Sequence, residues 1–385
     1  MLVEIVAGDA DPAHGGFPMR VHAILQMLAQ FARVRCILTT QSSHREIPGV
    51  EYEFQPIRET AIDKAGRLLS YYSTRSPGRR PSEIPDVIFV ESLDLFRFAR
   101  DLPDIPVVLD EHNIYWNQLP YEITNSGIFK TPFGQWPVLR GALVPWLLLR
   151  ARDFETRAIR SAEAVLVTSE RDRQVILSRM NDVASKVAVL PNCIDVRAWS
   201  SVGEEAPTPV VLFVGSFDYV PNRDAAQIIA DVIAPKIPEA EFVLIGDDPP
   251  SLANRPPNVT ITGHLPDIAP ALGRAWVCIA PLVRGSGTRI KVLTYLAAGK
   301  AVVSTTKGCE GLRLENERHL LIRDDLADFT DSLRELLQDP SLRHRLGAAG
   351  QAQMEALYDW RAHAAGLKQI VTRVATPQPE RAVVA

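Results

Sequence analysis

The sequence predicts an α/β protein built from two parallel-sheet units in succession. Short apolar runs alternate with amphipathic helical segments along most of the chain, as is typical of strand–helix–strand units. The alternation is interrupted by the polar stretch 200–209, which carries Pro and Gly and is the best candidate for a linker. The length of 385 residues also fits two domains of ordinary size.

The composition is that of a globular protein with an ample core, with 46% hydrophobic and 23% charged residues. The 42 basic and 46 acidic residues nearly balance, also within each half of the chain, which argues against a nucleic-acid partner. The N-terminus has neither the basic segment nor the long apolar run of a signal peptide, so we expect a cytoplasmic protein. Of four widely spaced cysteines, Cys36 and Cys278 lie in apolar runs and are expected to be buried thiols.

The first unit opens with a strand at 2–7, a glycine-bearing loop, a helix at 17–31 and a strand at 34–39. This order predicts a parallel sheet with the loop at its carboxyl edge, where ligands bind in such folds. The dinucleotide fingerprint G-x-G-x-x-G is absent. The pair Gly15 and Gly16 either allows a ligand to approach the backbone closely or forms a plain turn.

Two further strands are expected at 86–91 and 106–110, and the second runs directly into Glu111, His112 and Asn113. Polar residues that follow an apolar strand stand where α/β proteins place their chemistry. His112 is therefore a candidate functional residue, with a structural histidine as the alternative.

The segment 127–160 mixes aromatic and apolar residues with Arg and Pro. One interpretation is a helix packed on the first sheet; the other is a patch that touches a membrane surface, with arginines toward the headgroups. The unit then closes with a strand at 164–169, a helix at 170–179 and a strand at 187–191.

The second unit repeats the same alternation. The expected strands are 210–214, 241–245, 259–262, 276–280 and 301–304, and the expected helices are 223–233, 266–274, 289–298, 326–337, 342–358 and 359–374.

The most informative stretch follows the strand 276–280. A loop at 285–287 lets a ligand approach the backbone, and Thr288 offers a hydroxyl as the N-cap of the next helix. Arg289 and Lys291 would lie in its first turn, where free N–H groups and the positive end of the helix dipole gather. Two cations are unfavourable there without an anion, so this pattern favours a phosphate site. The alternative is an ordinary loop with two solvated basic residues.

The motifs of the chain resemble those of glycosyltransferase family 4, whose enzymes have the GT-B fold. The resemblance covers nearly the whole chain and is most specific from residue 187 to residue 315. Its motifs are GSFDYVPNRDA at 215–225, GSGTRIKVLTYLAAGK at 285–300, LPNCID at 190–195, DEHN at 110–113 and GCEGL at 308–312.

The resemblance implies two Rossmann-like, doubly wound domains that face a central cleft. Residues 1–200 would form the acceptor-side domain, 201–358 the nucleotide-sugar domain, and 359–385 a helix and tail that cross back to the first domain. Members transfer a sugar from a nucleotide-diphosphate donor to an acceptor with retention of configuration. Here the acceptor would be a glycan or a lipid-linked molecule, in polysaccharide or glycoconjugate assembly. The 127–160 segment would suit a peripheral location at the inner face of the plasma membrane.

By position in these motifs, the resemblance assigns Arg289 and Lys291 to the donor diphosphate and His112 to the transferred sugar. These three are the expected catalytic residues. The other residues expected at the donor are Gly16, Gly263, His264, Leu265, Ser286, Gly287, Thr288, Thr294, Glu310, Gly311 and Leu312. No metal and no cofactor are expected, because the basic pair would take the place of a divalent ion.

The chain departs from the family at its E-x7-E pattern, where Ser286 and Thr294 replace the two glutamates. A Thr hydroxyl can bond a ribose, but it lacks the charge-assisted bond of a carboxylate. The loop after Gly215 also has Ser216 and Asn222 where the family usually has Arg and Lys. These departures keep a second hypothesis open, a GT-B protein without turnover that binds ligand or activates a partner. An epimerase acting on nucleotide-sugars and a two-lobed solute-binding protein are more remote alternatives.

Overall fold

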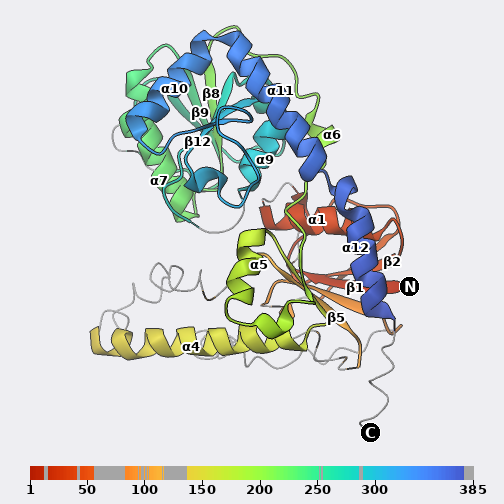
Figure 1. Cartoon of the computed structure of the whole chain (residues 1–385). Helices are drawn as coiled ribbons and strands as arrows, with labels where there is room; N and C mark the ends of the chain where they lie inside the picture. The colour runs from red at the N-terminus through yellow and green to blue at the C-terminus, as the bar shows by residue number, and fades with distance from the viewer. Residues whose placement is uncertain are drawn as a thin grey trace. The chain divides into compact units, whose positions relative to one another are not determined.

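A computed structural model of the chain describes residues 1–12, 16–40, 44–55, 83–93, 95, 96, 99, 102, 104–114, 116, 137–250, 252, 255–285 and 289–376. The chain divides into two compact units (Figure 1). Unit 1 consists of residues 1–11, 24–191 and 363–385, and unit 2 of residues 12–23 and 192–362.

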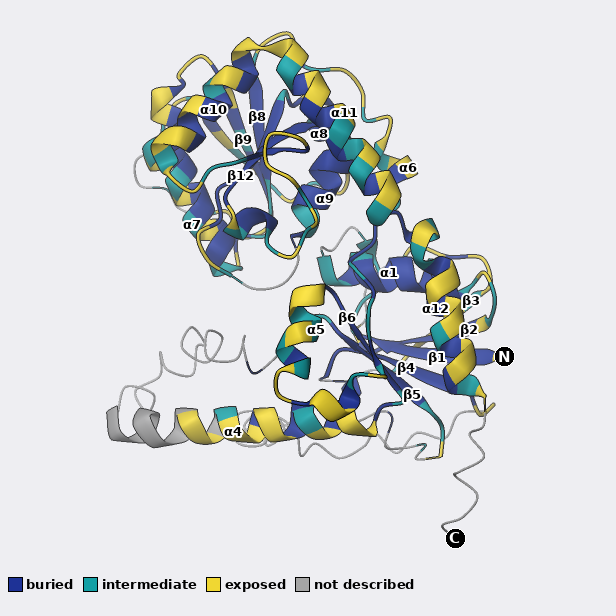
Figure 2. Cartoon of the chain, in the orientation of Figure 1, coloured by how far each residue is buried: buried dark blue, intermediate teal, exposed yellow. Residues whose placement is uncertain are grey.

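Unit 1 is built on a parallel sheet with the strand order β3-β2-β1-β4-β5-β6-β7. Continuous apolar runs form its central strands, and these are buried on both faces, as parallel strands between helices must be (Figure 2). The strands are β1 (Leu2–Ala7), β2 (Arg33–Leu38), β3 (Val50–Phe54), β4 (Val87–Glu91), β5 (Val107–Glu111), β6 (Ala164–Val167) and β7 (Val187–Val189).

The helices of unit 1 follow the expected order. They are α1 (Gly16–Leu28), whose first residues belong to unit 2, α4 (Pro137–Ser161) and α5 (Glu170–Leu177). Ser169 caps α5 by accepting a hydrogen bond from the backbone N–H of Asp172. The sequence analysis omitted β3, because this edge strand is mostly exposed and its residues VEYEF form no apolar run.

Unit 2 repeats the same topology with the strand order β10-β9-β8-β11-β12-β13. Counted from its own first strand, this is the 3-2-1-4-5-6 order of a Rossmann-type sheet, and all the pairings are parallel. The strands are β8 (Val210–Val214), β9 (Glu241–Ile245), β10 (Val259–Gly263), β11 (Val277–Ala280), β12 (Ala301–Ser304) and β13 (Leu321–Ile322).

The helices of unit 2 cover both faces of this sheet (Figure 1). They are α6 (Val196–Trp199), α7 (Val220–Ile228), α8 (Ala269–Arg274), α9 (Ile290–Ala297), α10 (Leu326–Gln338) and α11 (Pro340–Leu357), and α12 (Trp360–Ala375) begins in this unit and continues in unit 1. The fold prediction of two doubly wound α/β units is confirmed. The sequence analysis missed β13, which is only two residues long.

The linker predicted at 200–209 packs on unit 2 and does not separate the units. Ala206 donates its backbone N–H to the carbonyl of Arg274, and the indole N–H of Trp276 donates to the carbonyl of Ala206 at 2.7 Å. The chain passes from unit 1 to unit 2 earlier, between Pro191 and Asn192. Composition alone placed this boundary too late, because a polar stretch can be anchored by its backbone groups.

The last helix begins in unit 2 and belongs to unit 1 from His363 onward. Its first turn is fixed by the guanidinium of Arg361, which donates to Asp195 at 2.9 Å and to Asp359 at 3.0 Å. Further along, the ammonium of Lys368 lies 6.0 Å from the ring centre of Phe31 in unit 1. A single helix is therefore shared by both units.

Candidate functional site

The loop after β11 leads to the start of α9, but the helix begins one residue later than predicted. Arg289 is the residue before the first turn, with φ −85° and ψ 84°, and Lys291 is the second helical residue. Thr288, the predicted cap, lies outside the described residues together with Ser286 and Gly287. The first turn of α9 carries no acidic residue, so nothing within it offsets the positive end of the helix.

Lys291 lies in a cradle formed by Phe213, Gly215 and Asn222. Its ammonium donates to Asn222 Oδ1 at 2.6 Å and lies 4.2 Å from the centre of the Phe213 ring. A methyl group on Gly215 would come within 2.6 Å of this nitrogen, so only glycine leaves room for it. The amide of Asn222 is itself fixed, because its Nδ2 donates to the carbonyl of Ser216 at 2.7 Å.

The charge on Lys291 is destabilised in this position. Burial is the main cause and the neighbouring guanidinium of Arg289 is the second, and together they hold the pKa of Lys291 well below its usual 10.5. The acceptor Asn222 is neutral and brings no compensating charge. An anion bound here would reverse this effect.

Arg289 is buried beside Lys291, with 5% of its surface exposed. Its guanidinium donates to the backbone carbonyls of Lys307 and Arg284, each at 3.4 Å. Gly285 makes this position possible: its φ is +111°, and a methyl group there would lie 2.8 Å from Arg289 Nη2. The two cations are thus held side by side at the start of one helix.

Gly16 also lies at this helix start. A methyl group on Gly16 would come to 3.0 Å from Ile290 Cδ1, the side chain of the first residue of α9. The backbone of Gly16 is therefore next to the residue that separates Arg289 from Lys291. His14 and Gly15, from the same sequence motif, lie outside the described residues.

The end of β10 carries three further predicted donor residues. Gly263 has φ +74° and disturbs the register between β10 and β9, which suits glycine. The next residue, His264, is exposed and places its Nδ1 at 3.3 Å from Asp247 Oδ1. Leu265 packs against the core of unit 2.

The loop after β12 joins the cation pair through Lys307. The carbonyl of Lys307 accepts from Arg289, and its ammonium pairs with Glu310 Oε2 at 2.6 Å. Gly311 has φ +81°, and Leu312 packs on the core around α9. Arg289 and Glu310, which are 21 positions apart in sequence, therefore both contact Lys307.

Thr294 is buried in the middle of α9, with 4% of its surface exposed. Its hydroxyl donates to the carbonyl of Ile290 at 3.2 Å, the preceding turn of the same helix. The donor capacity of this hydroxyl is used within the helix, and its oxygen can still accept a hydrogen bond.

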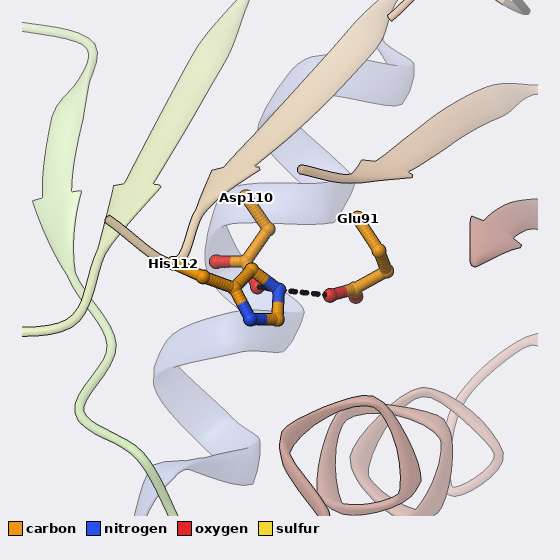
Figure 3. Close-up of side chains that lie close together, drawn as sticks. All are labelled: Glu91, Asp110 and His112. Carbon is orange, nitrogen blue, oxygen red and sulfur yellow. Dashed lines mark hydrogen bonds and ion pairs between the residues drawn. The ribbon is translucent and has the colours of Figure 1, made fainter. Parts of the chain in front are cut away.

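His112 belongs to a second cluster, in unit 1, at the carboxyl edge of its sheet (Figure 3). Its Nε2 lies 2.8 Å from Glu91 Oε2 and 3.1 Å from Asp110 Oδ2. Both carboxylates are fully buried, and 11% of the His112 side chain is exposed. Burial alone would lower the pKa of His112, but the carboxylates of Asp110 and Glu91 outweigh it, so this pKa is raised above the usual 6.5.

The three side chains of this cluster could also hold a metal ion, because their ligand atoms all lie within 4.8 Å of one another. Sequence reasoning found His112 but assigned no role to Glu91 or Asp110. The available signal was that both carboxylates stand at the ends of neighbouring parallel strands. Phe213 was missed in the same way, whereas Gly215 and Asn222 were noted as part of the motif at 215–225 but were not assigned to the site.

The segment 127–160 is described from Pro137 onward, as α4. Its second half packs on the sheet through Phe154, Ala158 and Ile159, which are buried, as the first interpretation expected. Its middle exposes Trp146 (42%) and Leu149 (64%). Among the described helices, none is long and apolar enough to cross a membrane.

Comparison with known proteins identifies the fold. Sucrose-phosphate synthase from Thermosynechococcus elongatus matches with a TM-score of 0.68 and 16% identity, over 97% of this chain and 98% of that chain. HepE from Anabaena, solved in complex with UDP and glucose, matches with a TM-score of 0.64 and 15% identity, over 96% and 99%. WaaG, a glycosyltransferase involved in lipopolysaccharide biosynthesis, matches with a TM-score of 0.62 and 15% identity, over 95% and 99%.

These matches define the class: the chain has the GT-B fold of glycosyltransferases. Residues 208–339, which lie in unit 2, match the family model described as Glycosyl transferases group 1. A search of curated proteins gives no match to the sequence. The matched region contains Arg289 and Lys291, and His112 lies outside it.

Proposed function

We propose that the protein transfers a sugar, with retention of configuration, from a nucleotide-diphosphate-sugar to a glycan or a lipid-linked acceptor. The observation that carries this proposal is the cation pair at the start of α9. The guanidinium of Arg289 donates to two backbone carbonyls, and the ammonium of Lys291 donates to the neutral amide of Asn222. A bound diphosphate would place negative charge beside these two cations.

The chemistry of glycosyl transfer fits such a site. When the bond between sugar and phosphate breaks, negative charge grows on the leaving diphosphate and positive character grows on the sugar. Fixed cations and helix N–H groups stabilise the charge on the diphosphate where it develops, without reorganisation at the moment of reaction. We assign this role to Arg289, Lys291 and the free N–H groups of α9, and we assign contact with the sugar to His112.

A uridine nucleotide is the first donor to test. HepE, which shares the fold, has been solved with UDP-glucose as well as with UDP and glucose. In this chain the region after β10 would border the base, with Gly263 and Leu265 shaping the backbone and His264 exposed beside it. The remaining predicted donor residues are Gly16, which would approach the phosphates, and Glu310, which lies beside Lys307.

The decisive experiment is UDP binding by the Arg289→Ala variant, measured by calorimetry. Loss of a hydrogen bond to a charged group is expected to weaken UDP binding about 10- to 100-fold, because such a bond contributes about 1.5 to 3 kcal/mol. The matched control is Arg318→Ala, because this exposed arginine of unit 2 pairs only at the surface with Glu315. Equal UDP affinity in the two variants would show that α9 does not bind the diphosphate.

One observation favours a second candidate function, a protein that binds a nucleotide-sugar without turnover. Thr294 stands where the family has a ribose-binding glutamate, and its hydroxyl proton is directed to Ile290. Release of UDP from UDP-sugars separates the two functions. Slow hydrolysis without acceptor, abolished in Arg289→Ala, supports the enzyme. Tight UDP binding with no hydrolysis and no transfer to glycan or lipid-linked acceptors supports the binding protein.

We also propose that α4 brings the protein to a membrane that holds a lipid-linked acceptor. From residue 137 to residue 152 the helix contains three arginines and no acidic residue, and Trp146 and Leu149 are exposed beside Arg150. Such a surface suits anionic headgroups with apolar side chains inserted between them. WaaG, of the same fold, is involved in lipopolysaccharide biosynthesis.

Co-sedimentation with anionic vesicles tests this surface. We expect the wild type to bind vesicles that contain phosphatidylglycerol, and the double variant Trp146→Ala with Leu149→Ala to bind several-fold less. Ile84→Ala is the control, because it removes an exposed apolar side chain elsewhere in unit 1. If the wild type does not bind the vesicles, or if all three proteins bind them equally, α4 does not bring the protein to a membrane.

A further inference from the structure

We propose that Tyr219 is a further donor-binding residue, whose phenol hydroxyl donates a hydrogen bond to the diphosphate beside Arg289. The proposal rests on the proposed function, because it names an additional contact of the same site. It brings the loop after β8, residues 215–219, into the phosphate site together with the start of α9.

The loops after β8 and β11 lie at the topological switch point of the unit 2 sheet. From β8 the chain proceeds to β9 and β10 on one side, and it then returns to β11 on the other side of β8. The strands β8 and β11 pair directly, with Val211 opposite Val277. In open α/β sheets the ligand crevice lies outside the carboxyl ends of the strands at this point. A ligand of unit 2 is therefore expected beside these two loops.

The helix α7, which follows the first of these loops, contacts the elements that follow β11. The amide of Asn222 accepts from the ammonium of Lys291 at 2.6 Å. The carboxylate of Asp224 accepts from the guanidinium of Arg284. Arg284 and Lys291 stand on either side of Arg289 in the sequence, so these two contacts fix the start of α7 next to the cation pair.

The hydroxyl of Tyr219 and the guanidinium of Arg289 converge on Gly285. A methyl group added to Gly285 would come within 2.6 Å of Tyr219 Oη, 2.8 Å of Arg289 Nη2 and 3.0 Å of Pro221 Cγ. Because glycine has no side chain, residue 285 does not fill this point, and a ligand can approach the backbone there. Such a ligand would meet the phenol hydroxyl and the guanidinium together.

The position of Tyr219 in α7 is unusual for its residue type. Tyr219 is the N-cap residue of this helix, where Ser, Thr, Asp or Asn normally accepts a hydrogen bond from the first N–H groups. Its side chain makes no capping bond, whereas its backbone carbonyl accepts from the N–H groups of Asn222 at 3.0 Å and Arg223 at 3.3 Å. A residue that departs from the local preference in this way indicates a role outside the helix.

A hydroxyl suits a site that already contains two cations. The guanidinium of Arg289, after burial, is the second cause that lowers the pKa of Lys291, so the two charges disfavour each other in the free protein. A third cation would add to this repulsion. A phenol supplies an O–H donor without adding charge, and its hydrogen bond to a charged phosphate oxygen is stronger than one between neutral groups.

The test compares UDP binding by Tyr219→Phe and by the wild type, measured by calorimetry. We expect the variant to bind UDP about 10-fold more weakly, because it loses a hydrogen bond to a charged group. Tyr52→Phe is the matched control, since it removes a hydroxyl that donates to the carbonyl of Arg45 in unit 1, at 3.2 Å. The UDP affinity of this control should stay within two-fold of the wild type.

Two further measurements separate a contact with the ligand from a contribution to the fold. The unfolding temperature of ligand-free Tyr219→Phe should equal that of the wild type, because the substitution removes a single oxygen from a half-buried side chain. The affinity for inorganic diphosphate should fall by the same factor as the affinity for UDP, because the hydroxyl is assigned to the phosphate groups and not to the nucleoside.

The proposal is overturned if Tyr219→Phe binds UDP as tightly as the wild type while Arg289→Ala binds it more weakly. It is also overturned if the unfolding temperature falls together with the UDP affinity, or if the affinity for inorganic diphosphate stays unchanged while the UDP affinity falls. If Arg289→Ala itself binds UDP normally, the proposed function fails, and the diphosphate contact of Tyr219 fails with it.

Discussion

The carboxyl edges of the two sheets have the same topology but opposite chemistry. In unit 1, strand ends supply two buried carboxylates around His112. In unit 2, the loop and helix after β11 supply two adjacent cations, of which Lys291 is held by a neutral amide. The Rossmann-type sheet therefore fixes where ligand groups stand, and the residues just beyond each strand decide the sign of the charge.

The largest expected effect is a loss of turnover in a variant of the unit 1 sheet edge, which a variant of the unit 2 sheet edge should not reproduce in the same way. His112→Ala should lower turnover about 100-fold, in the range found when a single hydrogen-bond donor to a transition state is removed. UDP affinity should change less than two-fold, because the diphosphate is assigned to unit 2. Arg289→Ala should instead weaken UDP binding. Turnover numbers and calorimetry of both variants check this, and a His112→Ala enzyme with near-normal turnover would contradict it.

The next effect concerns the pH dependence of the cation pair. The pKa of Lys291 is well below 10.5 in the free protein, and a bound diphosphate raises it. Binding therefore takes up a proton, and UDP affinity should fall as the pH rises from the free towards the bound pKa, by up to about tenfold per pH unit. Calorimetry in two buffers of different ionisation enthalpy measures the proton uptake.

Asn222→Asp is the matched variant for this measurement. It keeps the shape of the cradle but gives Lys291 a carboxylate partner, which should raise the pKa of Lys291 in the free protein. Proton uptake should then disappear, and UDP should bind more weakly at every pH, because the new carboxylate repels the diphosphate. Identical uptake in the variant and the wild type would mean that Lys291 is not the group that titrates.

The smallest expected effect is measured by substituting two glycines with positive φ, one in each unit. Gly285 has φ +111°, and an added methyl group would lie 2.8 Å from Arg289 Nη2, whereas at Gly49, with φ +86°, the nearest atom would be 4.0 Å away. Both alanine variants should lose about 1 to 2 kcal/mol of stability through backbone strain. Only Gly285→Ala should also weaken UDP binding, by a few-fold. Thermal unfolding measures the stability and calorimetry measures the UDP affinity. Equal UDP affinities of the two variants would show that the conformation at Gly285 does not control the position of Arg289.

The sequence predicted the regular part of the fold because buried parallel strands are continuous apolar runs, as in VIFVE at β4 and VCIA at β11. It missed β3 and β13, because β3 is mostly exposed and β13 is only two residues long. The predicted boundary at 200–209 differs from the observed one because this stretch is held to unit 2 by hydrogen bonds of Ala206 with Arg274 and Trp276, which the sequence does not show.

Some residues of the candidate site can be recognised from the sequence alone, and others cannot. His112 stands out because it directly follows an apolar strand, and Arg289 and Lys291 stand out because they lie at the start of a helix after a glycine-bearing loop. Asn222 and Glu91 do not stand out, since their importance comes from contacts across 69 and 21 positions of sequence. Local patterns indicate which residues could act on a ligand. They do not indicate which neighbours set the charge of those residues.

The way the backbone is distributed between the two units has a consequence for protein engineering. The chain changes unit at 11–12, 23–24, 191–192 and 362–363, and one of these changes lies inside α1 and another inside α12. A hybrid made by exchanging residues 192–362 alone would leave the stretch Pro12–Ala23 with the wrong parent, and it would join α12 from two parents within its first turn. Donor preference can therefore be transplanted from a related enzyme only if Pro12–Ala23 travels with the segment.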